Sequence, residues 1–214
     1  MQLQRRLICT TCLRPQSTCI CQWITPVAAA TDVLILQHPL EVDHAKNSAR
    51  LLHLSLPGSR MLTGETFTVV DLHADIQAAP YTVLLYPQTP HEPAPIADPA
   101  LLRDPAKIRL VVLDATWRKS RKMLHLNPCL RQLPRLSLDD TPASHYLIRK
   151  AHKPGQLSTL EATCAALAQL EHDGEKYLPL LEAFKGFVAQ QQALGGLQNR
   201  SLESDRDHTP AQGV

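Results

Sequence analysis

Four cysteines near the start of the chain have the residue type and spacing of a metal site. They follow the pattern C-x2-C-x6-C-x-C and comprise Cys9, Cys12, Cys19 and Cys21. Four thiolates around a tetrahedral ion form a closed structural zinc site. Iron in a four-cysteine site and free thiols are the alternatives. We predict a zinc-binding knuckle over residues 1–26.

Carboxylates that follow two apolar runs are candidates for acid–base chemistry. The string HPLE contains His38 and Glu41, and the string DATW begins with Asp114. A carboxylate beside a substrate can take up the proton that a nucleophile must lose. The structural alternatives are a hydrogen-bonded core histidine, an acid that favours a helix N-terminus, and a capping aspartate. The local pattern leaves both interpretations open.

Positive charge is concentrated in the stretch that begins at Asp114. Nine lysines and arginines and three aspartates lie between Asp114 and Lys153, a balance of +6 in a chain whose total is +2. Arg118, Arg121 and Lys122 are three and four residues apart and would share one helical face. Such a face suits a polyanion, and a solvated charged surface is the alternative.

The string LSTLE at residues 157–161 predicts the start of a helix. Ser158 and Glu161 can satisfy each other's main-chain donors as a capping box, and apolar residues follow at helical spacing. Free amides at a helix N-terminus can also bind a carboxylate or a phosphate. A plain capping role is the alternative.

Strands and helices that alternate along the chain would position these residues. Short apolar runs typical of strands buried on both faces of a parallel sheet occupy residues 32–37, 81–86 and 109–113. Helices are predicted at residues 45–54, at 116–127, from Ser158 onward, and at 177–194 with an end at Gly195-Gly196. The chain is therefore predicted to be α/β, with ligands at the carboxyl ends of the strands.

The composition is that of a globular protein with one main domain. The chain has 214 residues, of which 44% are hydrophobic and 20% are charged. It has no run of about 20 apolar residues and no secretory leader, so we expect a cytoplasmic protein without a membrane span. Signatures of the GxGxxG, Walker and Ser-His-Asp kinds are absent. The polar tail at 195–214 is expected to be disordered.

Four strings in one order, HPLE, LLYP, DATW and LSTLEA, together with the cysteine knuckle, resemble the DTW-domain family of tRNA-uridine aminocarboxypropyltransferases. The resemblance spans about residues 7–193 and points to the bacterial members that act on a variable-loop uridine. Two positions depart from it, because Ala115 stands where glycine is usual and Ser48 where threonine is common. It implies that residues 27–194 form a SPOUT-like knotted catalytic domain with a parallel-sheet core.

The resemblance also implies a reaction. S-adenosylmethionine would donate its 3-amino-3-carboxypropyl group to N3 of a tRNA uridine, and 5′-methylthioadenosine would leave. Uridine N3 must lose its proton, so we expect a carboxylate to act as general base. Asp114 is the expected base, Glu41 is the second choice, and His38 is the third residue expected in the catalytic group.

The remaining motif residues are expected to contact the donor and the RNA. Main chain at strand ends would hold the adenosine, and amides of the capped helix would hold the donor carboxylate. The expected donor-binding residues are Leu85, Tyr86, Pro87, Leu113, Thr116, Leu157, Ser158 and Thr159. Trp117 would stack on a splayed base or pack behind Asp114. The expected RNA-binding residues are Trp117, Arg118, Lys119, Arg121, Lys122, Arg149, Lys150 and Lys153.

Two other functions would use some of the same residues. A SPOUT-type RNA methyltransferase would share the donor and the fold but would transfer the methyl group. A zinc-dependent RNA-binding module without catalysis would use the knuckle and the basic stretch, but it gives HPLE, LLYP and DATW no role. The sequence leaves open which tRNAs would be modified, and whether the chain works as a monomer or a homodimer.

Overall fold

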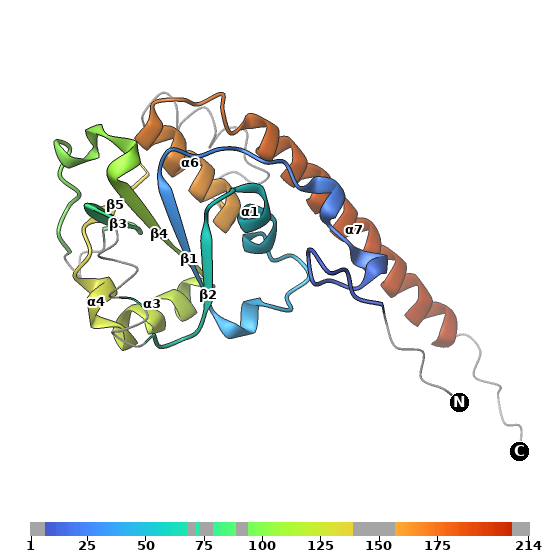
Figure 1. The fold of residues 1–214 in the computed structure, drawn as a ribbon. Helices are drawn as coiled ribbons and strands as arrows, with labels where there is room; N and C mark the ends of the chain where they lie inside the picture. Colours follow the sequence, from blue (N-terminus) through green and yellow to red (C-terminus); the bar gives the residue numbers. More distant parts are fainter. Residues whose placement is uncertain (1–6, 68–71, 73–78, 89–93, 139–156, 207–214) are drawn as a thin grey trace, which may run out of the picture.

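A parallel five-stranded sheet is the centre of the fold (Figure 1). The computed structural model describes residues 7–67, 72, 79–88, 94–138 and 157–206. The strands lie in the order β2-β1-β4-β3-β5. They are β1 Asp32–Gln37, β2 Arg60–Thr63, β3 Tyr81–Leu85, β4 Ile108–Asp114 and β5 Arg135–Leu136. The predicted α/β class is confirmed, and the three predicted strands are β1, β3 and β4.

The apolar runs form strands because helices cover both faces of the sheet. Val33 and Ile35 of β1 pack in one core cluster, and Leu34 and Leu36 pack in another on the opposite face. Each such side chain contributes about 1.5–3 kcal/mol when fully buried. The helices of the first cluster are α1 Ala49–Ser55, α6 Thr159–Glu171 and α7 Leu178–Arg206, and those of the second are α3 Trp117–Leu126 and α4 Pro128–Arg131.

Two edge strands are not predicted by the sequence patterns. β2 has the mixed sequence RMLT and pairs in parallel with β1. β5 is two residues long and pairs with Leu84 and Leu85 of β3. Neither strand has the length or the apolar run that marks a strand in sequence. Their formation depends on the neighbouring strands that the fold supplies.

Two helices begin where the sequence predicts them to begin. α6 begins at Thr159 behind the predicted Ser158 capping box, and α3 begins at Trp117 directly after Thr116, whose side chain forms no capping hydrogen bond. The start predicted at residue 45 is wrong, because α1 begins at Ala49. The segment before it forms a 3-10 turn at Pro39–Glu41 and further turns, so its main-chain donors are satisfied outside a helix.

The predicted end of the last helix is also wrong. α7 does not stop at Gly195-Gly196 but continues to Arg206, through the first part of the predicted disordered tail. A glycine inside a helix costs only about 1 kcal/mol relative to alanine, so flanking helix formers can continue the helix. Residues 207–214 lie outside the described part of the chain. Neither α7 nor any other helix of the described residues has the length and hydropathy to cross a membrane.

The cysteine segment packs against α7 and shares its core. Cys9, Cys12 and Ile20 are buried in the same cluster as apolar residues of α7. Trp23 donates its indole N–H to Gln190 Oε1 of α7 at 2.5 Å. Figure 1 shows the N-terminal segment beside this helix. The division of the chain after residue 26 stays a prediction.

Alanine at Gly186 of α7 is expected to lower the free energy of unfolding by about 1–3 kcal/mol. A Cβ at this position would overlap the ring of Trp23, which Gln190 holds in place. Gly195→Ala is the matched control, because nothing lies within 4 Å of the added atom in the same helix. The control should gain about 0.5–1 kcal/mol in helix propensity. Urea unfolding measures both variants, and stabilisation by both would contradict the packing of Trp23 on Gly186.

Candidate active site and metal centre

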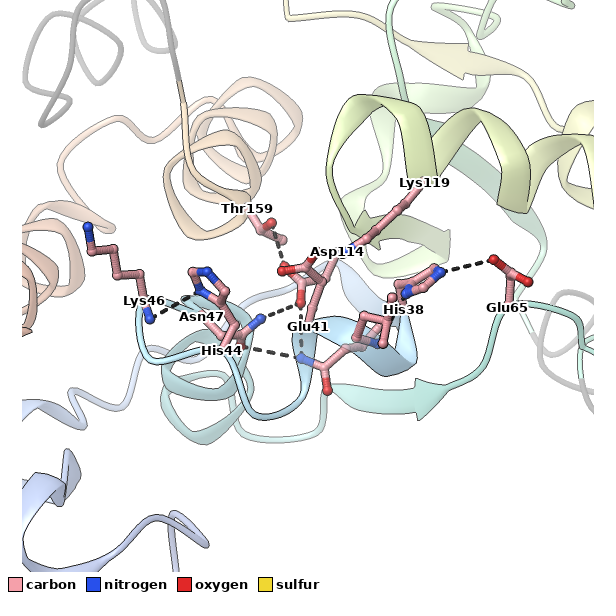
Figure 2. A network of polar contacts seen from close by, with 11 residues as sticks. His38, Glu41, His44, Lys46, Asn47, Glu65, Asp114, Lys119 and Thr159 are labelled. Carbon is pink, nitrogen blue, oxygen red and sulfur yellow. Dashed lines mark hydrogen bonds and ion pairs between the residues drawn. The ribbon is translucent and has the colours of Figure 1, made fainter.

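Asp114 lies at the centre of a polar network at the carboxyl end of β4 (Figure 2). Its side chain is buried, with 4% of the residue exposed. The carboxylate accepts hydrogen bonds from Asn47 Nδ2 at 2.6 Å, Gln37 Nε2 at 3.0 Å and Thr159 Oγ1 at 2.7 Å. Gln37 is opposite Asp114 in the parallel register of β1 and β4. One carboxylate therefore joins two strand ends, the loop before α1 and the first turn of α6.

The two oxygens of Asp114 differ in how many donors they receive. Oδ2 accepts from both side-chain amides, whereas Oδ1 accepts from the Thr159 hydroxyl. A carboxylate oxygen has two acceptor positions, so these hydrogen bonds use both positions of Oδ2 and one of Oδ1. Asp114 forms no ion pair with the residues that the structure describes. Only neutral donors contact its carboxylate among these residues, and Oδ1 can accept one further hydrogen bond.

His38 is held through both of its ring nitrogens. Nδ1 accepts from the Leu40 amide at 3.1 Å and so caps the 3-10 turn, and Nε2 lies 3.0 Å from Glu65 Oε1. Because the amide can only donate to Nδ1, we assign the proton of the neutral ring to Nε2, which donates to Glu65. The hydrogen bonds of Lys122 and then of His38, together with the charge of Lys122, lower the pKa of Glu65 below its usual range. His38 thus positions the turn that carries Glu41.

The basic helix α3 uses two of its four cations inside the protein. Lys119 Nζ lies 2.7 Å from Glu41 Oε1, and Lys122 Nζ lies 3.0 Å from Glu65 Oε2. Arg118 and Arg121 are exposed and form no ion pair with the described residues. The remaining cations of the predicted RNA-binding group, Arg149, Lys150 and Lys153, lie outside the described residues.

The predicted donor-binding residues gather at the same edge of the sheet. Leu85 ends β3 and is opposite Val112 of β4, so Tyr86 and Pro87 leave the sheet beside Leu113. Thr159 of α6 reaches this edge through its hydrogen bond to Asp114. Thr116, the N-cap residue of α3, is exposed just beyond β4.

The predicted capping box at the start of α6 is confirmed. Ser158 Oγ accepts from the Glu161 amide at 3.2 Å, and Glu161 Oε2 accepts from the Ser158 amide at 2.7 Å. The Leu160 amide donates to Ser48 Oγ at 3.3 Å. Three amides of this helix start are therefore occupied by the protein itself. A ligand carboxylate at this helix start would have to bind the main-chain amides of Leu157 and Thr159.

Trp117 is exposed beside a buried tyrosine. The indole is 67% exposed, and its ring centroid lies 5.6 Å from that of Tyr86 in an edge-to-face arrangement. Tyr86 is buried, with its hydroxyl 3.4 Å from Ser120 Oγ and the Arg135 guanidinium 5.0 Å from its ring centroid. Tyr86 therefore supports Trp117, whose exposed surface is free of the core packing that was its alternative role.

Ala115, one of the two departures from the family pattern, needs no special backbone. Among the described residues other than glycine, only Leu13 and His172 have a positive φ angle. Alanine therefore adopts the main chain between Asp114 and Thr116 without strain. Its side chain packs at the edge of the second core cluster.

The four predicted cysteines form one cluster. Their Sγ atoms all lie within 4.8 Å of one another, with 3.5 Å between Cys9 and Cys21 and 3.8 Å between Cys12 and Cys19. A tetrahedral ion with Zn–S bonds of about 2.3 Å places its sulfurs about 3.8 Å apart. Hydrogen bonds from the main-chain amides of Cys12 and Thr11 lower the pKa of Cys9 to about 6, whereas burial and the neighbouring thiols raise the pKa of Cys21. The cluster can bind a metal such as zinc.

Three side chains of the network are absent from the predicted site. Gln37 and Asn47 hold Asp114, and Glu65 holds His38. In the sequence, Gln37 is marked only as a polar residue at the end of an apolar run, and Asn47 only as a polar residue next to Ser48. Glu65 follows β2, which itself has no strand signal, so no pattern in the sequence identifies it.

The fold and the site define an α/β protein with a polar site at the carboxyl ends of parallel strands and a four-cysteine cluster that can hold a metal. The DTW domain matches residues 6–192, and the chain belongs to the DTW domain family.

Relatives in three organisms carry one enzyme name. The chain is 32% identical over 206 residues to tRNA-uridine aminocarboxypropyltransferase 2 of Drosophila melanogaster, covering 93% of this chain and 80% of the relative. It is 30% identical to tRNA-uridine aminocarboxypropyltransferase A of Arabidopsis thaliana, over 80% of this chain and 75% of the relative. The Mus musculus tRNA-uridine aminocarboxypropyltransferase 2 is 29% identical over 87% of this chain and 65% of the relative. No solved structure matches the chain.

Proposed function

We propose that this protein transfers the 3-amino-3-carboxypropyl group of S-adenosylmethionine to N3 of a tRNA uridine in the variable loop. The observation that carries the proposal is the shared enzyme name of relatives that align with up to 93% of the chain. In the transfer, the bond between N3 and the γ-carbon forms while the bond from that carbon to sulfur breaks. The electron pair stays on sulfur, and 5′-methylthioadenosine leaves as a neutral thioether.

Asp114 Oδ1 is the proposed acceptor of the N3 proton. This oxygen has one acceptor position beyond its bond with Thr159, whereas Oδ2 is held by two amides. Asn47, Gln37 and Thr159 would fix the direction of the carboxylate. Glu41 remains the second candidate base, although Lys119 holds it at 2.7 Å. His38 would act by capping the turn that carries Glu41.

The donor is proposed to lie between the ends of β3 and β4 and the start of α6. Main chain around Leu85, Tyr86 and Leu113 would hold the adenosine, with Pro87 and Thr116 at the border. The amides of Leu157 and Thr159 would hold the donor carboxylate, beside the Ser158 capping box. This placement would direct the γ-carbon toward the Asp114 edge of the sheet and the methyl group away from it.

Purified protein, unmodified tRNA and S-adenosylmethionine labelled separately in the methyl and carboxyl carbons test the function directly. Nucleoside mass analysis should find the carboxyl label on uridine, with methylthioadenosine released in equal amount. Methyl label on RNA would make the protein a methyltransferase. Absence of both labels from every RNA, with no binding of the donor in calorimetry, would make it a metal-dependent RNA-binding module.

RNA binding is proposed to depend on Arg118 and Arg121 together with Trp117 and the three cations between β5 and α6. The double variant Arg118→Ala/Arg121→Ala should lower the magnitude of the slope of log K against log salt by about 1.4–1.8, since each phosphate contact contributes about 0.7–0.9. Arg103→Ala/Lys107→Ala is the control. It removes two cations just before β4, at the amino end of this strand, whereas Asp114 lies at its carboxyl end. Equal slopes for the wild type and the α3 variant would contradict the assignment.

The remaining parts of the proposal rest on the family resemblance and the cysteine cluster. We propose zinc as the ion of the cluster, because its four sulfurs have the spacing of a tetrahedral site. Zinc there would cross-link residues that are 12 positions apart in the chain. A SPOUT-like knotted arrangement of the domain at 27–194 and a cytoplasmic location belong to the same proposal.

A further inference from the structure

Arg14 connects the cysteine turn to the loop that holds Asp114. Its Nη1 donates to the Ala45 carbonyl at 2.7 Å and its Nη2 to the Asn47 carbonyl at 3.3 Å. The guanidinium also lies 5.4 Å from the ring centroid of Phe187 on α7. The side chain is therefore fixed by two carbonyls and an aromatic ring, in a fork geometry that lysine cannot reproduce.

The turn of the cysteine segment at residues 9–14 fixes the position of the Arg14 main chain. The Cys9 amide donates to the Arg14 carbonyl at 2.8 Å, and the Leu13 amide donates to the Cys9 carbonyl at 3.0 Å. Leu13 has φ of 59°, in the left-handed region that a leucine rarely adopts. Arg14 thus follows a tight turn that carries Cys9 and Cys12.

Asn47 bonds to Arg14 through its main chain and to Asp114 through its side chain. Its carbonyl accepts a hydrogen bond from the Arg14 guanidinium, and its side-chain Nδ2 donates to Asp114 Oδ2 at 2.6 Å. Its Oδ1 accepts from the Arg50 amide at the start of α1 and from Gln37 Nε2. A shift of the Asn47 peptide would therefore move the amide that orients the carboxylate.

We infer that Arg14 is a positioning residue for the transfer reaction, and that it couples the four-cysteine turn to Asp114 through Asn47. The inference rests on the proposed function for its kinetic consequence. The coupling itself is a property of the loop. When Arg14 is lost, the cluster keeps its four thiols, but the Ala45 and Asn47 carbonyls each lose the hydrogen bond that holds the loop against the turn.

The first test compares Arg14→Lys and Arg14→Ala with Arg103→Lys and Arg103→Ala, at an exposed arginine in the 3-10 turn before β4. Both Arg14 variants should lose about 10- to 100-fold in kcat with a smaller change in KM, since a displaced catalytic group slows the chemical step. Guanidinium ion at millimolar concentration should restore part of the kcat of Arg14→Ala. Metal content should stay at the wild-type level.

The second test does not depend on activity. Amide hydrogen exchange of the peptide at 44–50 should rise by about tenfold in Arg14→Lys, while exchange in the cysteine segment at 7–23 stays unchanged. Unchanged exchange at 44–50 would overturn the inference, as would loss of metal from Arg14→Lys, because Arg14 would then act only on the knuckle. If the wild type forms no product on any tRNA, the proposed function fails while the exchange result still decides the coupling.

The third test asks whether Arg14 acts through Asn47. In an Asn47→Ala background, Arg14→Lys should cost less than about twofold in kcat, because the amide that it positions is already gone. Gly186→Ala serves as the control for simple loss of stability, since its added Cβ meets the ring of Trp23 in the same N-terminal segment. Full and independent losses in the double variant would overturn the route through Asn47.

Discussion

Asp114→Asn is expected to lower kcat by about 100- to 10,000-fold, the range for loss of a general base. The asparagine would present an N–H₂ group either to the Thr159 hydroxyl or to the two amides that now donate to Oδ2. It would also remove the acceptor for the N3 proton. Single-turnover kinetics with labelled donor measure the effect. Asp104→Asn is the control, because Asp104 is exposed just before β4 and bonds to Lys107.

The loss at Asp114 has two separable causes, removal of a base and disorder of the network. A tRNA with 5-fluorouridine at the target position has a more acidic N3 and should recover a large part of the rate of the variant. The rate of the variant on normal tRNA should rise by about tenfold per pH unit as N3 ionises in solution. Equal defects on both tRNAs and no pH dependence would assign Asp114 to positioning alone. Turnover within twofold of wild type would contradict both roles.

Loss of metal from the four-cysteine cluster is expected to lower the free energy of unfolding by at least about 4 kcal/mol. For a chain of this size the melting temperature should fall by about 8–16 °C. The effect is large because Cys9, Cys12 and Ile20 belong to the main core with α7, so disorder of the turn exposes that face. Calorimetry with a strong chelator, and with the variant Cys12→Ser, measures it.

Cys129→Ser is the matched control for the cluster. Cys129 is half-buried in α4 and contacts the second core cluster, outside the four-cysteine cluster. Its replacement should leave the metal content and the melting temperature close to those of the wild type. Elemental analysis distinguishes zinc from iron. A protein that is free of metal as purified, and as stable as its Cys12→Ser variant, would show that the thiols do not serve a structural ion.

Features that depend on neighbours in sequence follow from the sequence alone. The runs at β1, β3 and β4 are largely apolar because both of their faces are buried. The capping box of Ser158 and Glu161 forms between residues three apart, and the first two cysteines lie in one short turn. Local patterns identify such features because the partners are close before the chain folds.

Features that depend on distant contacts were decided by the tertiary structure. β2 and β5 exist through pairing with β1 and β3. Arg118, Arg121 and Lys122 have the spacing of a polyanion-binding face, yet the fold places Glu65 against Lys122, and Glu41 against the neighbouring Lys119. Sequence spacing specifies a helical face but not what packs opposite it.

The candidate site shows the same division. The sequence by itself identified Asp114, His38, Glu41 and the cysteines, because each lies in a short motif beside an apolar run or a turn. Only the tertiary structure showed that Gln37, Asn47 and Thr159 hold Asp114, across 77, 67 and 45 positions of the chain. Such contacts form only after the sheet register and the helix packing have offset the entropy of closing those loops. The motifs therefore determined which groups are present, and the packing of the sheet and α6 determined what each of them can do.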